Sequence, residues 1–513
     1  MKFDDFQIEV EPLTGAMPVW RGRVDAQQWS TACQQARDRG GRLLALWGAD
    51  NSDRGEGVAV HAALVVSSGM LVITLPLAGE SFPDISGIFP AANRMQRAIH
   101  DLFGVSGEGA ADRRKWLRHA AWPEGVFPLR KSFDAGTVFA NGKDGYPFVQ
   151  VGGEGVHEIP VGPVHAGTIE PGHFRFSIVG EGVLRLEERL GYKHKGIEKR
   201  FEQMDLGEGA RLAGRISGDS TVAYAWAYAM AVEGVTRVIP PERALWLRAL
   251  LLERERIGQH LWDLGFLGND AGLAFGLAQF SCLREDMLRT NALLFGHRYL
   301  MDGIVPGGVA RDIDGGGIAR IRGEMESVGK TVTLLKDIYV EHAGLQDRFV
   351  DCGRIRHEVA ARLGLAGLAG RSSGIGNDLR AQFATAPYDR LGVRMTVREG
   401  GDVAARATVR VEEIMESLRL CGMILDGLPD GEIAMPLPAA PENAFGIGWV
   451  EGWRGEVLIA LETGANNRIR RLHPHDPSWQ NWPLLERAVL GNIVPDFPLI
   501  NKSFNLSYAG HDL

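Results

Sequence analysis

Long segments with helical spacing dominate the last two thirds of the chain and most strongly limit what it can fold into. They run over 203–232, 240–264, 277–300, 321–342 and 403–425. Pro240-Pro241-Glu242 indicates a helix start, because a proline in the first turn has no N–H to leave unpaired. The stretches HFRFSIVG and GWRGEVLIALETG, from residues 173 and 452, favour strands. We therefore predict a mainly helical part with a small sheet over residues 161–513.

A different pattern precedes this helical part. Asp25 can cap a helix over residues 26–39, and GGRLLALWG after it is typical of a strand. The helical spacing of Met95, Ile99 and Leu102 predicts a second helix. We expect a small α/β domain over 1–147 and a glycine-rich linker over 148–160, which makes the whole chain an α+β protein.

One uncharged stretch approaches the length of a membrane span. It runs over 62–79 and reads AALVVSSGMLVITLPLAG. Ser67-Ser68-Gly69 interrupts it, Pro76 lies near its end, and Val, Ile and Thr are frequent, so we predict a β-hairpin. Membrane contact is then expected only through partner subunits.

Charge and cysteine content exclude several functions. The net charge of −8 gives no electrostatic footprint for nucleic acid or an anionic membrane surface. The cysteines are scattered, which favours buried thiols in a reduced, cytoplasmic protein and argues against a thiolate-held cluster. They are Cys33, Cys282, Cys352 and Cys421.

Several long motifs carry a resemblance to a known family. The segment 162–202, GPVHAGTIEPGHFRFSIVGEGVLRLEERLGYKHKGIEKRFE, resembles the large subunit of membrane-bound, energy-converting [NiFe] hydrogenases of the formate hydrogenlyase type. It is also similar to the D subunit of NADH–quinone oxidoreductase (complex I). RSSGIGNDLR from residue 371 and WRGE from residue 453 fit the same family. Residues 97–133 resemble the C subunit of complex I, so the order is C-like and then D-like.

The resemblance implies a metal site that has lost its ligands. The family holds nickel and iron with two Cys-x-x-Cys pairs, which fall here on Ser217 and Ser220 in RISGDS and on Ser507 and Gly510 in NLSYAG. A thiolate is a soft anionic ligand, whereas a serine hydroxyl is hard and normally neutral. We therefore predict no metal ligand in this chain and a vacated cavity between these residues.

The quinone contacts of complex I are missing as well. By the same resemblance, Gly218 stands at the position of a quinone-binding tyrosine. His165 matches the first histidine of the loop that carries the family's other quinone contact, but Ile169 replaces the second histidine. A quinone bound in another way stays open, and these residues do not argue for it.

The resemblance also suggests acids and histidines that can transfer protons. Glu170 stands where related hydrogenases place a glutamate on the proton route. His165 and His194 titrate near neutral pH, with the alternative that each is a structural histidine bonded to backbone. Glu198 shares a face with His194 if that segment is helical. Asp219 either charges the cavity or serves the first turn of a helix.

Two further motifs have structural alternatives. Asp378 and Arg380 in GNDLR match the family near the vacated cavity and form either a cavity-side pair or an ordinary salt bridge. HPHDPSW, from residue 473, holds two histidines and an acid. It is expected to be a connecting loop, because a metal site needs a further convergent ligand.

These observations predict a peripheral subunit, on the inner face of the cell membrane, of a membrane-attached energy-converting complex. The resemblance implies an iron–sulfur small subunit and membrane ion-translocating subunits as partners, with no cofactor held by this chain. The alternatives are a non-redox structural subunit and a subunit that reduces a quinone or another carrier. A [NiFe] hydrogenase proper is disfavoured by the missing thiols.

Overall fold

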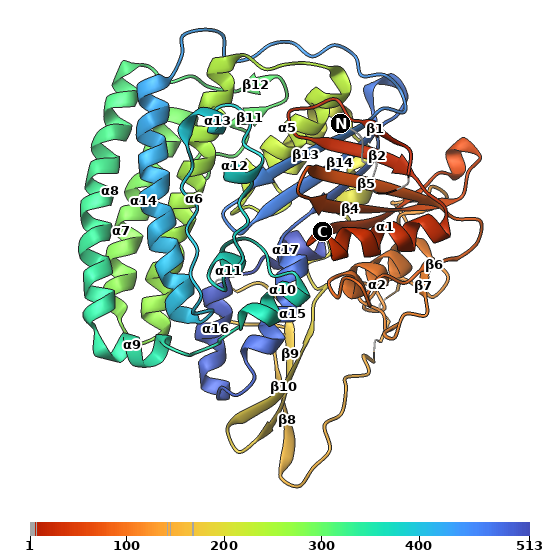
Figure 1. Cartoon of the computed structure of the whole chain (residues 1–513), viewed down its shortest axis with the longest axis horizontal. Helices are drawn as coiled ribbons and strands as arrows, with labels where there is room; N and C mark the ends of the chain where they lie inside the picture. The colour runs from red at the N-terminus through yellow and green to blue at the C-terminus, as the bar shows by residue number, and fades with distance from the viewer. Residues whose placement is uncertain (1–5, 7, 141, 144, 167–168) are drawn as a thin grey trace.

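The computed structural model describes residue 6 and residues 8–140, 142–143, 145–166 and 169–513. Figure 1 shows a layer of long helices on one side, the N-terminal sheet on the other, and a second sheet between them. A third sheet projects below, beside the C-terminal helices. The prediction of a mixed α and β architecture is confirmed.

The N-terminal part is a five-stranded sheet covered by two helices. Its strand order is β1-β2-β5-β4-β3, with β2 and β5 parallel and the other pairs antiparallel. The strands are β1 Val10–Pro12, β2 Val19–Arg23, β3 Arg42–Asp50, β4 Val58–Val66 and β5 Gly69–Pro76, and the helices are α1 Ala26–Asp38 and α2 Ala92–Phe103. A short parallel pair, β6 Ser81–Pro83 and β7 Ser106–Glu108, lies beside them.

Local sequence signals explain these elements. Asp25 accepts a hydrogen bond from the Gln28 amide, and the Gln28 side chain accepts one from the Asp25 amide, so a full capping box starts α1. The uncharged stretch forms the antiparallel hairpin β4–β5, as predicted. Across the part of the chain described here, no helix combines the length and the apolar character needed to cross a membrane.

Four long helices form the helical layer. They are α6 Glu242–Asp270, α7 Ala274–Phe295, α8 Gly315–Glu341 and α14 Val403–Gly427. Shorter elements connect them: β11 Ile304–Val305, β12 Gly308–Val309, α9 Ala343–Phe349, α10 His357–Leu363, α11 Gly367–Arg371, α12 Leu379–Gln382 and α13 Tyr388–Leu391. The helix predicted from Pro240-Pro241-Glu242 begins at Glu242 and continues beyond its predicted end.

The segment predicted as one helix over 203–232 is divided. It forms α4 Leu206–Ala213 and the first part of α5 Thr221–Thr236, and the short helix α3 Ile197–Phe201 precedes it. The break over 214–220 contains RISGDS, where glycine and serine have weak helix propensity.

The middle sheet is antiparallel and packs closely on α5. It consists of β13 Phe445–Glu451, β14 Glu456–Thr463 and β15 Ile469–His475. A Cβ at Gly448 would lie 1.7 Å from the Ala227 carbonyl oxygen, so only glycine permits this approach. His473 and His475 lie on β15, so the prediction of a connecting loop there was wrong. The sequence His473-Pro474-His475 does not resemble a strand, yet these residues form the buried end of β15.

The remaining elements surround the C-terminus. The third sheet has the order β10-β9-β8, from β8 Val156–Val161, β9 His173–Val179 and β10 Gly182–Arg189. Beside it lie α15 Ser478–Ala488, α16 Phe497–Phe504 and α17 Tyr508–Asp512. Strand β8 begins inside the segment predicted as a linker.

Ion pairs join the N-terminal part to the middle sheet. Arg42 on β3 bonds both carboxylate oxygens of Glu456 on β14. Arg470 on β15 donates to Asp53 through Nε at 3.0 Å, and Arg471 donates to the Gly48 carbonyl at 2.9 Å. We call this contact between the N-terminal part and the middle sheet the seam.

Candidate functional site

The four positions of the vacated site converge although they are far apart in sequence. Ser217 lies before α5, and Ser507 caps α17. Their Oγ atoms are 2.8 Å apart, and the Gly510 amide donates to Ser507 Oγ at 2.8 Å. Ser220 Oγ accepts from Arg454 at 3.2 Å. The hydroxyls thus hydrogen-bond to one another and to protein groups.

An ion pair sits at the centre of this site. Arg454, in the turn between β13 and β14, donates from Nη1 to Asp219 Oδ1 at 2.9 Å and also bonds Oδ2. Asp219 Oδ1 accepts from Ser217 at 2.8 Å, and the Asp219 carbonyl accepts from Trp453 at 2.8 Å. Burial favours a raised pKa for Asp219, but the charge and hydrogen bonds of Arg454 outweigh it and hold the pKa below its usual value. Asp219 therefore charges the site and is no helix cap.

The ion pair forms one wall of a cavity of about 400 Å³. Ser217, Gly218 and Ser507 line the same wall. The rest of the lining mixes charged and apolar groups, including Glu170, Asp270, Lys502, Ile169 and Phe266. The volume suits a small polar molecule or a cofactor headgroup. We call this space the vacated cavity.

The residues present do not fit a Ni–Fe centre. Three hydroxyls and a glycine replace the thiolates, and Arg454 brings a positive charge to the place where the family holds metal cations. A Cβ at Gly510 would lie 2.4 Å from Asp476 Oδ2, so any side chain there requires Asp476 or α17 to shift.

Glu170 and His165 lie near the vacated cavity in different roles. Glu170 lines it, accepts from the Ala509 amide at 3.1 Å and pairs with Lys193 at 3.4 Å. His165 contacts the Gly172 carbonyl at 2.7 Å through Nε2, so the ring ties its own loop together. The geometry favours Glu170 over His165 as a group facing a ligand.

His194 and Glu198 line a separate cavity of about 30 Å³ at the seam, and each of them bonds a different partner. His194 precedes α3 and bonds the Asp512 carbonyl at 2.8 Å. Glu198 instead bonds His473 at 2.8 Å and Arg471 at 2.7 Å. Burial raises the pKa of Glu198, but Arg471 and then His473 outweigh it and lower the pKa to about 2.

The two histidines and the aspartate of HPHDPSW each bond a different partner. His473 bonds Glu198, His475 bonds Gln480 at 3.0 Å, and Asp476 accepts from the Tyr224 hydroxyl at 2.7 Å. Within the described ranges, no three His, Cys, Asp or Glu side chains form a cluster that could hold a metal ion.

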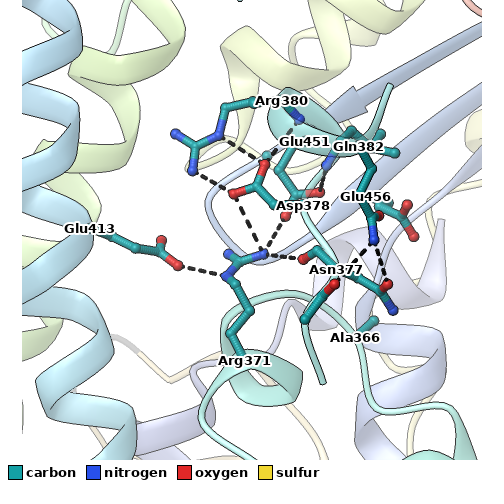
Figure 2. Close-up of polar contacts among 12 residues, drawn as sticks. Ala366, Arg371, Asn377, Asp378, Arg380, Gln382, Glu413, Glu451 and Glu456 are labelled. Atoms are coloured by element: carbon teal, nitrogen blue, oxygen red, sulfur yellow. Dashed lines mark hydrogen bonds and ion pairs between the residues drawn. The ribbon is translucent and has the colours of Figure 1, made fainter. Parts of the chain in front are cut away.

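Asp378 and Arg380 belong to a buried charge network (Figure 2) and do not line the vacated cavity. They pair at 2.7 Å, and Arg380 also bonds Glu253 at 2.9 Å. Arg371 donates to Glu413 and to Glu451, each at 2.8 Å. Glu253, Glu413 and Glu451 were missed from the sequence, although Asp378 and Arg380 were singled out. The available signal was EGWRGE, in which two acids flank the arginine of the WRGE motif.

Comparisons with known proteins support the arrangement predicted from the motifs. A family model described as respiratory-chain NADH dehydrogenase, 30 Kd subunit, matches residues 23–138. A second, described as respiratory-chain NADH dehydrogenase, 49 Kd subunit, matches residues 270–444. Formate hydrogenlyase subunit 5 of Escherichia coli (strain K12) is 31% identical over 484 residues, which cover 92% of this chain and 85% of that protein. The chain belongs to the family of formate hydrogenlyase subunit 5.

The chain is also similar in sequence to subunits of complex I. The fused C/D subunit of NADH-quinone oxidoreductase from Bacteroides fragilis is 28% identical over 83% of this chain and 84% of that protein. A chain in the solved structure of the membrane-bound sulfane sulfur reductase, an archaeal respiratory membrane complex, superposes with a TM-score of 0.66. It is 24% identical and covers 70% of this chain and 99% of that chain, which shows a shared fold. The fused order of a C-like and a D-like part is confirmed.

Proposed function

We propose that the chain is a peripheral subunit of a membrane-attached complex that couples electron transfer to ion or proton translocation. It acts there without a Ni–Fe centre of its own. In this proposal, electrons arrive from an iron–sulfur cluster in a partner, and contact with the membrane runs through ion-translocating partner subunits. The two parts correspond to a C-like domain over 1–147 and a D-like domain over 161–513.

One observation carries the proposal. The chain matches the formate hydrogenlyase subunit 5 family along most of its length, yet the Asp219–Arg454 pair lies where the resemblance implies a metal site. The cavity beside this pair persists, with Glu170 at its wall. A retained, charged cavity favours an active role over a purely structural one.

Purification of the chain from its native host tests the assembly. We expect an affinity-tagged chain, extracted with mild detergent, to bring down membrane subunits and an iron–sulfur subunit, identified by mass spectrometry. Elemental analysis should find iron in the complex and nickel far below one atom per chain. The untagged host strain is the control. Nickel at one atom per chain, or recovery of the chain alone, would contradict the proposal.

Two isosteric variants separate the coupling role from the structural one. We expect Glu170→Gln and Asp219→Asn to assemble normally but to slow electron flow about a hundredfold, since each removes a charge from the cavity wall. The assay follows transfer from reduced viologen to a soluble quinone by the purified complex. Asp426→Asn, in an exposed pair with Arg322, is the matched control. Normal rates in both cavity variants would favour the structural alternative.

A further inference from the structure

The turn between β13 and β14 sends charged side chains to two separate places. Arg454 near its tip reaches Asp219 in the vacated cavity. Glu451 on β13 and Glu456 on β14 lie opposite each other in the strand register at the base of the turn, where the two strands reach the seam. Arg256 on α6 donates to the carbonyl of Glu451 at 2.8 Å and to that of Gly452 at 3.2 Å, so the turn is held from inside. One short, fixed turn therefore connects the vacated cavity to the seam.

A further cavity, which we call the seam cavity, opens at the base of this turn. It has a volume of about 180 Å³ and lies between residues 40–44 of the N-terminal part and residues 360–367 of the helical part. Glu451 and Glu456 both line it. Arg42 binds Glu456 through both carboxylate oxygens, whereas Glu451 shares Arg371 with Glu413. Water in this cavity can bring a proton to Glu451.

Charge balance around Glu451 favours an additional proton. The carboxyl groups of Glu253, Asp378, Glu413 and Glu451 are all at least nine-tenths buried, and so are their cationic partners Arg256, Arg371 and Arg380. His260, bonded to Glu413 at 2.8 Å, has its pKa lowered by burial and so does not supply the missing positive charge at neutral pH. A buried carboxylate without a full counter-charge is costly, and protonation removes the cost.

The groups that face Glu451 agree with this balance. Figure 2 shows Glu451 beside Asp378 and Arg371. Burial, followed by the negative charge of Asp378, raises the pKa of Glu451 to about 7 against the opposing effect of Arg371. The charged neighbours, taken element by element, are Arg42 on β3, Arg256 on α6, Arg371 on α11, Asp378 before α12, Glu413 on α14 and Glu456 on β14.

We propose that Glu451 is a proton-binding residue that exchanges its proton through the seam cavity and is coupled to the Asp219–Arg454 pair through the turn 451–456. A change of charge in the vacated cavity alters the proton affinity of Glu451, and protonation of Glu451 alters the field at Arg454. The use of this proton in energy conversion rests on the proposed function. The proton site itself is a property of the isolated chain and can be tested without any partner.

Infrared difference spectroscopy of the purified chain, taken across a pH titration, tests the site. The wild-type chain should show the C=O band of a buried carboxylic acid that disappears with a midpoint near pH 7. Glu451→Gln, which mimics the protonated side chain, should lose this band and keep the band of Glu255, a second carboxyl group whose pKa burial raises to about 8. Asp219→Asn should lower the midpoint by roughly half a pH unit or more, because Arg454 then keeps its positive charge without a carboxylate. Asp426→Asn, which breaks an exposed aspartate–arginine pair, should leave the midpoint unchanged.

Two results would overturn the inference. The first is a wild-type chain with no carboxylic acid band that titrates between about pH 5 and 9, or one whose titrating bands are all kept in Glu451→Gln. The second is a midpoint that stays the same in Asp219→Asn, which would separate the proton site from the vacated cavity. Neither result bears on assembly of the complex, so failure here and failure of the proposed function are distinguishable.

Discussion

Replacing Arg371 with methionine is expected to destabilise the folded chain by about 3–5 kcal/mol near pH 8. The Arg371 side chain is buried and donates to Glu413, to Glu451 and to the Asn377 carbonyl, each at 2.8 Å. Methionine replaces the aliphatic stem of arginine but has no guanidinium group, so the variant leaves buried carboxylates facing fewer cations. The cost is the uncompensated burial of negative charge, which exceeds the loss of any single hydrogen bond.

The loss of stability in the Arg371 variant should also depend on pH in a definite direction. The folded-state pKa of Glu451, about 7, lies above its unfolded value of about 4.5, so its protonation favours the folded state below about pH 4.5, and this contribution is lost as the pH rises through 7. Without Arg371, the raised pKa of Glu451 should rise further, and the pKa of Glu413, which Arg371 holds below its usual value, should rise as well. The deficit of the variant should therefore be largest at pH 8 and shrink toward pH 5.

Urea unfolding followed by circular dichroism at both pH values measures the deficit. Arg322→Met removes an arginine from an exposed pair with Asp426 and should cost less than about 1 kcal/mol at either pH. If the Arg371 variant matched this control, the buried network would not need its cation, and the charge balance inferred for Glu451 would be wrong.

Local signals predicted the elements better than the site. Asp25 and Pro240-Pro241-Glu242 act within one helical turn, so the starts of α1 and α6 follow from neighbouring residues. The strand at His473 was missed because its polar side chains, His473 and Arg471, are buried against Glu198, which is far away in the sequence. Propensity and spacing cannot show which distant side chains bury a segment.

In the vacated cavity, too, the sequence predicted some features and not others. Motif resemblance indicated that Ser217 and Ser507 belong together, and their hydroxyls are in hydrogen-bond contact. It did not indicate that Arg454 would pair with Asp219, because either residue alone has an ordinary solvated alternative. The proton-transfer roles of Glu170 and Asp219 remain predictions. Glu451 went unnoticed because its chemistry comes from burial and from its neighbours rather than from its residue type.

Replacing Gly510 with alanine is expected to destabilise the chain by about 1–3 kcal/mol, the cost of overpacking a buried site. The new Cβ would meet Asp476 Oδ2 at 2.4 Å and Ser507 Oγ at 3.0 Å. Asp476 cannot retreat easily, since it accepts from the Tyr224 hydroxyl at 2.7 Å and from the Ser478 amide at 2.8 Å.

Gly218→Ala is the matched control for this variant. Gly218 lines the same cavity, but a Cβ there would meet only Met301 Cε at 3.5 Å, an ordinary contact. Thermal unfolding of the two variants should therefore show a clear loss for Gly510→Ala and almost none for Gly218→Ala. Equal stability of the two would mean that α17 moves freely away from Asp476, and a cysteine at residue 510 would then be sterically acceptable. The predicted loss instead means that return of the fourth thiol requires a change at Asp476 as well.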